Sequence, residues 1–140
     1  IFMVFDEFSV FAGEQVLNLV NMGRGKGVHV VFGTQGLADL DRVDLGFKSQ
    51  VMNCVNSIIC HRINDQDSAE AVTSWIGTKD AFVLSTQFNP NQTDDGVGTV
   101  GNTKEFIVHP DEIKQGLGTG EGYFVSKVGG FGVEKVRVKY

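Results

Sequence analysis

Two adjacent carboxylates stand at the end of the first apolar run of the sequence. The chain opens with "IFMVFDEF", so Asp6 and Glu7 directly follow five apolar residues, and a second apolar run, "VHVVFG", is followed by Thr34 and Gln35. A carboxylate in such a place can hold Mg²⁺, which prefers oxygen ligands. A second carboxylate can polarise a water for attack, and a glutamine can orient that water in phosphoryl-transfer sites. These residue types therefore predict phosphoryl-transfer chemistry, provided that they lie together.

The surrounding elements predict that they do lie together. We expect residues 1–5 to form a strand buried on both faces, residues 14–22 a helix, and residues 28–33 a second apolar strand. A strand–helix–strand unit makes its two strands parallel. The carboxyl ends of both strands then meet at one edge, which is where open α/β sheets bind ligands. In the alternative interpretation, Asp6 and Glu7 only cap the following helix, although Gly13 and Glu14 leave room between the acid pair and that helix.

Arg24 is expected at the opposite edge of the sheet. The chain leaves the first strand, runs down helix 14–22 and passes Arg24 before it enters the second strand. Arg24 is therefore not expected to reach its own site, but it could reach the site of a neighbouring copy in a ring and stabilise charge on a transferring phosphoryl group. Alternatively, its charge complements the carboxyl end of helix 14–22.

The remainder of the chain is expected to continue as one α/β domain. In order, we expect a helical segment over 45–52, a strand over 55–63, a helix over 65–77, a mobile loop over 87–103, a strand over 104–110 and a hairpin that turns at Gly129–Gly130. The buried face of helix 65–77 is expected to comprise Ala71, Val72, Trp75 and Ile76.

Composition limits the classes of function. The chain has 140 residues and a net charge of −5, which suits one soluble domain and argues against a general nucleic-acid binder. A local basic face of Lys135, Arg137 and Lys139 on the last strand leaves a DNA contact open, although a solvated edge is the simpler interpretation. Cys54 and Cys60 show no metal-ligand spacing and are interpreted as reduced thiols, which favours the cytosol.

Residues 1–40, "IFMVFDEFSVFAGEQVLNLVNMGRGKGVHVVFGTQGLADL", resemble the Walker B half of the conjugative coupling proteins of type IV secretion. These are the TraD/TraG-like DNA-pumping ATPases, within the RecA-like hexameric translocases. The later stretches "SIICHRINDQDSAEAVTSWIG" and "HPDEIKQGLGTGEGYFVSKVGG" resemble a strand with its helix and the closing strands of the same family. The resemblance implies that residues 1–140 are the C-terminal part of a RecA-like P-loop NTPase domain, α/β in class. Parallel strands with helices would be followed by a C-terminal antiparallel hairpin, with closing strands over about 104–140.

The resemblance also implies a role for each candidate residue. Asp6 would help to bind ATP by holding Mg²⁺, Glu7 would activate the hydrolytic water, and Gln35 would sense the bound nucleotide. Arg24 would be the arginine finger that acts on the adjacent subunit. The full-length protein would be an ATP-driven DNA translocase at the cytoplasmic face of the inner membrane. Its partners would be other copies of itself in a ring, DNA, relaxosome or secreted substrate proteins, and the secretion channel.

The sequence departs from the family pattern at the phosphate-binding loop. The motif G-x-x-x-x-G-K-[ST] is absent, since "GRGKG" has the wrong spacing and "GLGTGEG" has no lysine. We expect that loop, the membrane anchor and the all-helical domain upstream of Ile1, and we expect this chain alone to be a soluble piece that binds ATP poorly, does not hydrolyse it and exposes a sheet edge. Two alternatives stay open: a docking module for substrate protein or DNA without catalysis, and an unrelated α/β enzyme that uses Asp6 and Glu7 with a metal.

Overall fold

The computed structural model of the chain describes residues 1–42, 44, 46–86 and 98–139. The helices and strands follow in the order β1 (Phe2–Phe5), α1 (Phe8–Phe11), α2 (Glu14–Gly23), β2 (His29–Phe32), α3 (Phe47–Cys54), β3 (Ser57–Cys60), α4 (Gln66–Ile76), β4 (Thr78–Thr86), β5 (Gly98–Phe106), α5 (Pro110–Gln115), β6 (Glu121–Ser126) and β7 (Gly132–Arg137). Two short 3₁₀ helices, η1 (Arg24–Lys26) and η2 (Leu37–Arg42), flank β2.

The predicted strand–helix–strand unit is confirmed. Strands β1 and β2 pair in parallel, with Phe2 opposite His29 and Phe5 opposite Phe32, and α2 forms the crossover between them. Glu14 lies in the first turn of α2, where a negative charge is favourable to the helix dipole. Gly27 follows η1 with φ 72°, so the glycine-rich "GRGKG" does end this helical segment in a left-handed residue.

The expectation that β1 is buried on both faces is wrong for this chain. Phe2 is 69% exposed and Val4 63% exposed, while the alternate residues Met3 and Phe5 are half-buried. A strand shows alternate residues to opposite faces. The core therefore covers one face of the β1–β2 pair, and within the described residues nothing covers the other.

Strand β3 belongs to a second sheet, in which β6 lies between β3 and β7 and all pairings are antiparallel. The predicted hairpin of β6 and β7 is confirmed, since Gly129 and Gly130 take φ values of 74° and 125° between the two strands. The predicted strand over 55–63 is shorter than expected. Cys54 ends α3, so the two cysteines do not share a strand, and both are free thiols.

The predicted helix over 65–77 is confirmed as α4. The Asp65 side chain caps its start, and Gly77 follows its end. Val72 and Ile76 are buried as predicted, whereas Ala71 and Trp75 are only half-buried. The buried stripe is turned by about one position, because Ser68, Ala69 and Thr73 also face the core.

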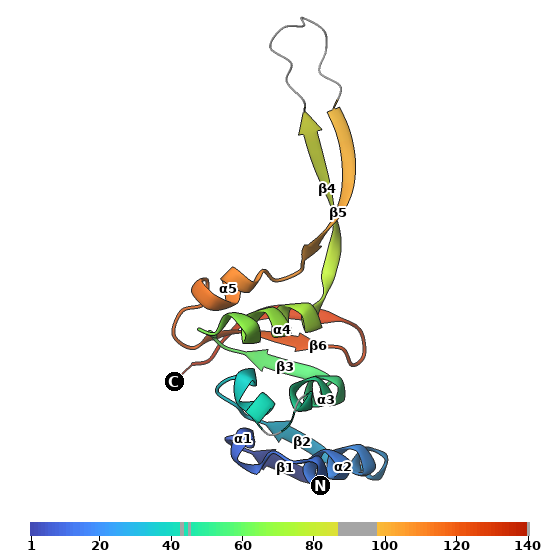
Figure 1. Cartoon of the computed structure of the whole chain (residues 1–140), viewed down its shortest axis with the longest axis vertical. Helices are drawn as coiled ribbons and strands as arrows, with labels where there is room; N and C mark the ends of the chain where they lie inside the picture. Colours follow the sequence, from blue (N-terminus) through green and yellow to red (C-terminus); the bar gives the residue numbers. More distant parts are fainter. Residues whose placement is uncertain (43, 45, 87–97, 140) are drawn as a thin grey trace, which may run out of the picture.

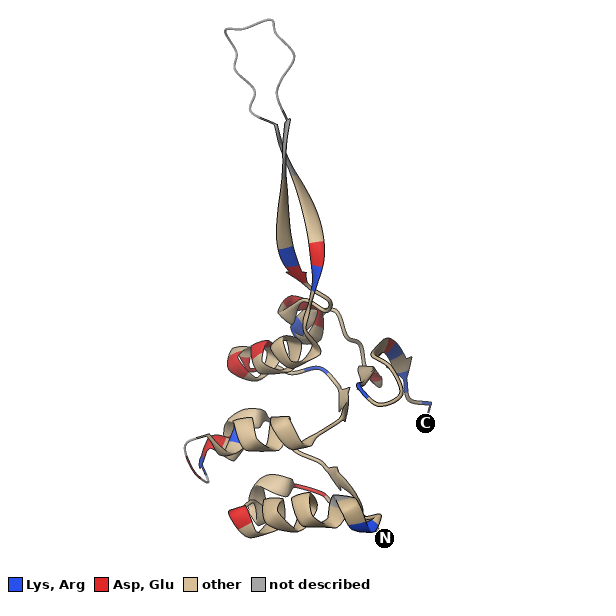
Figure 2. Ribbon diagram, turned by 90° about the vertical axis from the view of Figure 1, so that its right-hand side faces the viewer, with Lys and Arg blue, Asp and Glu red and all other residues tan. Residues whose placement is uncertain are grey.

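Strands β4 and β5 form a two-stranded ribbon that projects from the body of the molecule (Figure 1). No strand was predicted over β4, and the predicted loop over 87–103 is wrong for 98–103, which belong to β5. The predicted strand over 104–110 is confirmed only for 104–106, where β5 ends. Residues 87–97 of that predicted loop lie outside the described residues. Residues 98–106, "GTVGNTKEF", show no apolar alternation. They are instead paired with β4 along their whole length through the backbone. Figure 2 shows opposite charges near its base, where Lys79 lies opposite Glu105.

The hydrophobic core runs between the two sheets through the helices that connect them. Its fully buried large side chains are Phe8, Leu40, Phe47, Ile113 and Val125. In Figure 1 the helices α2, α3 and α4 follow one another along the body, with α5 beside α4. Helix α5 was not predicted, since closing strands were expected over about 104–140. His109 caps it, and Pro110 occupies its first turn, where a missing N–H does no harm.

Candidate catalytic edge of the parallel sheet

The acid pair lies where β1 turns into α1. The Gly33 N–H donates to the Phe5 carbonyl at 2.8 Å, and the Phe8 N–H donates to the Gly33 carbonyl at 2.7 Å, so the β1–β2 pairing continues to the acid pair. Gly33 leaves room at this place, because a Cβ there would make a tight contact of 3.3 Å with Oδ1 of Asp6. The backbone of β2 can therefore approach Asp6 closely.

The structure brings Glu7 and Gln35 together. Nε2 of Gln35 donates a hydrogen bond of 2.6 Å to Oε1 of Glu7. Both side chains are exposed to solvent at the carboxyl edge of the parallel pair. Thr34 has a local role instead, since its hydroxyl donates to the Gly36 carbonyl and shapes the turn after β2.

Glu7 holds an unusual backbone conformation. Its φ of 51° and ψ of 53° are left-handed, and it is the one residue other than glycine with positive φ in the described parts of the chain. Such residues are uncommon and cluster at functional sites. Glu7 precedes the unpredicted helix α1, but its side chain makes no capping hydrogen bond, so the geometry does not support capping by Glu7. The Asp6 carboxylate accepts a hydrogen bond from the Glu7 N–H at 3.1 Å.

The backbone of Arg24 lies at the other end of the strands. It begins η1, which precedes β2. The amino group of Ile1 donates to the Gly27 carbonyl at 3.1 Å, so the end of η1 lies beside the start of β1. The predicted position of Arg24, at the edge opposite Asp6, Glu7 and Gln35, is therefore confirmed for its backbone.

A groove of about 170 Å³ separates the end of β2 from β3. Residues 34–37 line one side, and residues 58–63 with Val72 line the other. His61 and Arg62 thus follow β3 at the same edge as Gln35. The sequence did not predict this groove, because the neighbourhood of β2 and β3 depends on how helices and sheets pack.

The carboxylates at this edge could bind Mg²⁺ in the way of sites that use only one or two protein ligands. In the described part of the chain, no three His, Cys, Asp or Glu residues gather as a ligand cage. Mg²⁺ commonly keeps several waters and binds through one or two carboxylates together with substrate phosphates. Asp6 and Glu7 supply carboxylates of that kind at an exposed edge.

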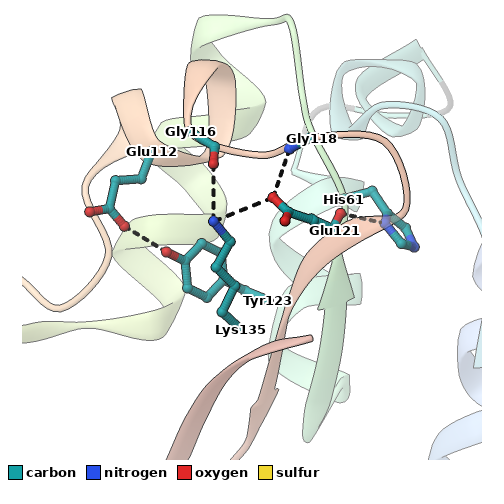
Figure 3. A network of polar contacts seen from close by, with 7 residues as sticks. All are labelled: His61, Glu112, Gly116, Gly118, Glu121, Tyr123 and Lys135. Atoms are coloured by element: carbon teal, nitrogen blue, oxygen red, sulfur yellow. Dashed lines mark hydrogen bonds and ion pairs between the residues drawn. The ribbon is translucent and has the colours of Figure 1, made fainter. Parts of the chain in front are cut away.

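A network of polar contacts holds the closing segment of the chain together (Figure 3). The Glu121 carboxylate accepts from the Gly118 N–H at 2.9 Å and lies 3.4 Å from Nζ of Lys135. Nζ of Lys135 also donates to the Gly116 carbonyl, so this member of the predicted basic face is engaged within the chain. The ring of His61 contacts the Glu121 carbonyl through Nδ1 at 2.9 Å.

Tyr123 completes the network of Figure 3. Its hydroxyl donates to Oε2 of Glu112 at 2.6 Å. Burial and then this hydrogen bond raise the pKa of Tyr123 to about 12. The bond ties β6 to α5, so the network serves the packing of the closing elements.

Two carboxylates, Asp65 at the start of α4 and Glu121 at the start of β6, predict that the stability of the fold falls in acid. Hydrogen bonds from Ser68 lower the pKa of Asp65 below its ordinary value of 3.8, and the Gly118 N–H and Lys135 lower the pKa of Glu121 below 4.5. A lowered pKa in the folded state contributes stability that is present above the ordinary value and is lost as the pH falls through the lowered one. We expect the melting temperature of the chain to fall as the pH drops from about 5 to about 3. The double variant Asp65→Asn, Glu121→Gln should flatten that dependence in a thermal melt, and an unchanged slope would contradict this explanation.

Comparison with known proteins shows the family to which the chain belongs. The family described as the TraM recognition site of TraD and TraG matches residues 1–116. The chain therefore belongs to this TraD and TraG family, as the sequence resemblance predicted. None of the curated proteins compared with the chain matches it.

A solved structure described as the bacterial conjugative coupling protein TrwBdeltaN70, unbound monoclinic form, has a similar fold, with a TM-score of 0.72 and 20% sequence identity. The match covers 99% of this chain and 31% of that one, so the chain spans about a third of the length of that coupling protein. The predicted α/β class, with parallel strands and a C-terminal antiparallel hairpin, is confirmed, and the fold is similar to that of this coupling protein. In the described residues, no helix is long and apolar enough to cross a membrane.

Proposed function

We propose that this chain supplies the water-activating half of an ATP-hydrolysing site in a conjugative coupling protein that moves DNA. Membership of the TraD and TraG family supports a role in conjugative coupling. The observation that carries the catalytic part is the 2.6 Å hydrogen bond between Gln35 and Glu7 at the carboxyl edge of two parallel strands. In this proposal residues 1–140 form the C-terminal part of a RecA-like ATPase domain.

Each residue has a distinct task in the proposed site. Glu7 accepts a proton from the attacking water, and the Gln35 amide holds the Glu7 carboxylate in place. Asp6 would hold the Mg²⁺ that accompanies ATP. When bound, Mg²⁺ neutralises charge on the phosphates. The left-handed backbone at Glu7 fits a residue whose orientation is set for such a task.

In this proposal the phosphate-binding loop comes from outside residues 1–140, which do not contain its motif. The groove between the end of β2 and β3 supports a place for it, because it separates two sheets at the edge that carries Gln35. We propose that a strand leading to the phosphate-binding loop enters there. The full-length protein would then work as a ring at the cytoplasmic face of the inner membrane, beside the secretion channel.

Arg24 is proposed to act on the site of the neighbouring subunit, because its backbone lies at the far end of the strands from Glu7. The variants Glu7→Gln and Arg24→Ala of the full-length protein should each lose ATP hydrolysis. Mixed rings should regain part of it, since some interfaces then pair an intact Glu7 with an intact Arg24. Steady-state phosphate release measures this. Recovery in the mixture supports the proposal, and rings of mixed variants as inactive as either parent would contradict it.

A second candidate function is docking of a relaxosome protein. The description of the family as a TraM recognition site favours it, and the projecting ribbon of β4 and β5 offers exposed surface, including Phe82 at 75% exposure. Direct DNA docking by the basic face of Lys135, Arg137 and Lys139 has less support, because Lys135 is engaged with Glu121. In a pull-down with a relaxosome protein, loss of binding in Glu7→Gln would argue against two separate functions.

A further inference from the structure

Ser68 links helix α4 to the loop that carries Gln35. Its side chain is buried, with 1% of the residue exposed, and its hydroxyl oxygen accepts a hydrogen bond of 3.2 Å from the Leu37 N–H. Leu37 begins η2, only two residues after Gln35. The loop after β2 is thus fastened, just beyond Gln35, to an element more than thirty residues later in the chain.

Ser68 is itself firmly placed. Its N–H donates to Oδ2 of Asp65 at 2.8 Å, which caps the start of α4. Hydrogen bonding from Ser68 also lowers the pKa of Asp65, which favours the charged carboxylate that accepts this bond. The same helix buries Val72 and Ile76 in the core. The Leu37 N–H is therefore held by a group that cannot move without the helix.

We propose that Ser68 is a positioning residue for ATP hydrolysis: its hydroxyl fixes the backbone at Leu37 and so keeps the Gln35 amide on the Glu7 carboxylate. This inference rests on the proposed function. Ser68 touches neither Glu7 nor Gln35 by any hydrogen bond in the described residues, and acts only through the short segment between Gln35 and Leu37.

Loss of the hydroxyl has a specific physical consequence. The variant Ser68→Ala leaves the N–H of a buried residue without its acceptor, which is unfavourable. The loop can restore that bond by moving towards water, and Gln35 moves with it. Because misplacement of a catalytic group by about 1 Å can slow a reaction about 100-fold, we expect kcat to fall about 10-fold or more. The KM for ATP should stay within about twofold, since the phosphate-binding residues lie elsewhere.

The test compares three variants of the full-length protein. Ser68→Ala removes the hydroxyl and Ser68→Thr keeps it. The matched control is Ser57→Ala, which removes an exposed hydroxyl that donates to the Ser126 hydroxyl at 3.2 Å in the closing sheet. Steady-state kinetics gives kcat and KM for each. Hydrogen exchange of the Leu37 amide in the 140-residue chain reports the link itself without any nucleotide.

We expect Ser68→Ala to lose kcat with little change in KM and to exchange the Leu37 amide faster, while Ser68→Thr and Ser57→Ala behave like the wild type. A wild-type kcat in Ser68→Ala would overturn the inference, as would unchanged exchange at Leu37. Equal losses in Ser68→Ala and Ser68→Thr, with KM rising and the melting temperature falling together, would show a merely structural role and also overturn it. If Glu7→Gln keeps full ATP hydrolysis, the proposed function fails, yet the exchange at Leu37 still decides whether Ser68 holds the loop.

Discussion

Replacing Glu7 with glutamine is expected to lower the kcat of ATP hydrolysis by about 10² to 10⁴-fold in the full-length protein, the usual contribution of a general base. The change keeps the size of the side chain and its capacity to bond Gln35, which now donates to a neutral amide oxygen rather than a carboxylate. It removes the group that accepts the proton from water. Binding of ATP should survive, because Asp6 and the phosphate-binding residues are unchanged.

The control for this variant is Glu14→Gln, an exposed carboxylate at the start of α2. It removes the same charge from the same region of the chain, so its ATP hydrolysis should match the wild type. Phosphate release and equilibrium binding of labelled ATP are the two measurements. If Glu7→Gln hydrolyses ATP at the wild-type rate, Glu7 is not the base and the proposed assignment is wrong.

Replacing Phe8 with alanine is expected to destabilise the chain by about 3–5 kcal/mol, the typical range for a buried phenylalanine. Phe8 is 0% exposed, and its ring centroid lies 4.1 Å from that of Phe32 on β2. It also contacts Phe5 and Phe47, so it joins both parallel strands to α3. Because Phe8 directly follows Glu7, its removal should also loosen the acid pair.

Denaturant unfolding of the 140-residue chain measures this effect. Phe2→Ala removes the same side chain from an exposed position in β1, 69% exposed, and should cost much less stability. A loss below about 1 kcal/mol for Phe8→Ala would mean that the aromatic cluster does not hold the site in place.

Short sequence patterns, such as apolar runs, helical spacing and turn glycines, were enough to predict several elements. The apolar runs before Asp6 and before Thr34 gave two strands, and the helical spacing between them gave the parallel pairing that the structure confirms. Gly129 and Gly130 marked the hairpin. Of the ribbon of β4 and β5, only residues 104–106 were predicted as a strand, because residues 98–103 are polar and glycine-rich and carry no apolar alternation. The short helix α1 likewise lacked any capping signal.

In the candidate site, too, some features follow from the sequence and others depend on packing. Strand direction was enough to predict that Glu7 and Gln35 share an edge, and the hydrogen bond between them agrees with that prediction. The glycine at position 33 is visible in the sequence, but only the structure shows that its missing side chain leaves room for Asp6. Ser68 is separated from Leu37 by thirty-one positions, and only the packing of α4 beside η2 makes them neighbours. The catalytic roles of Asp6, Glu7, Gln35 and Arg24 stay predictions.

The most direct measurement is a structure of the full-length Glu7→Gln protein with Mg²⁺ and ATP. The proposed function predicts Mg²⁺ beside Asp6, the terminal phosphate facing residues 7 and 35, and Arg24 of the adjacent subunit turned towards that phosphate. Nucleotide bound away from the carboxyl edge of β1 and β2, with Asp6 and Gln35 remote from its phosphates, would contradict it.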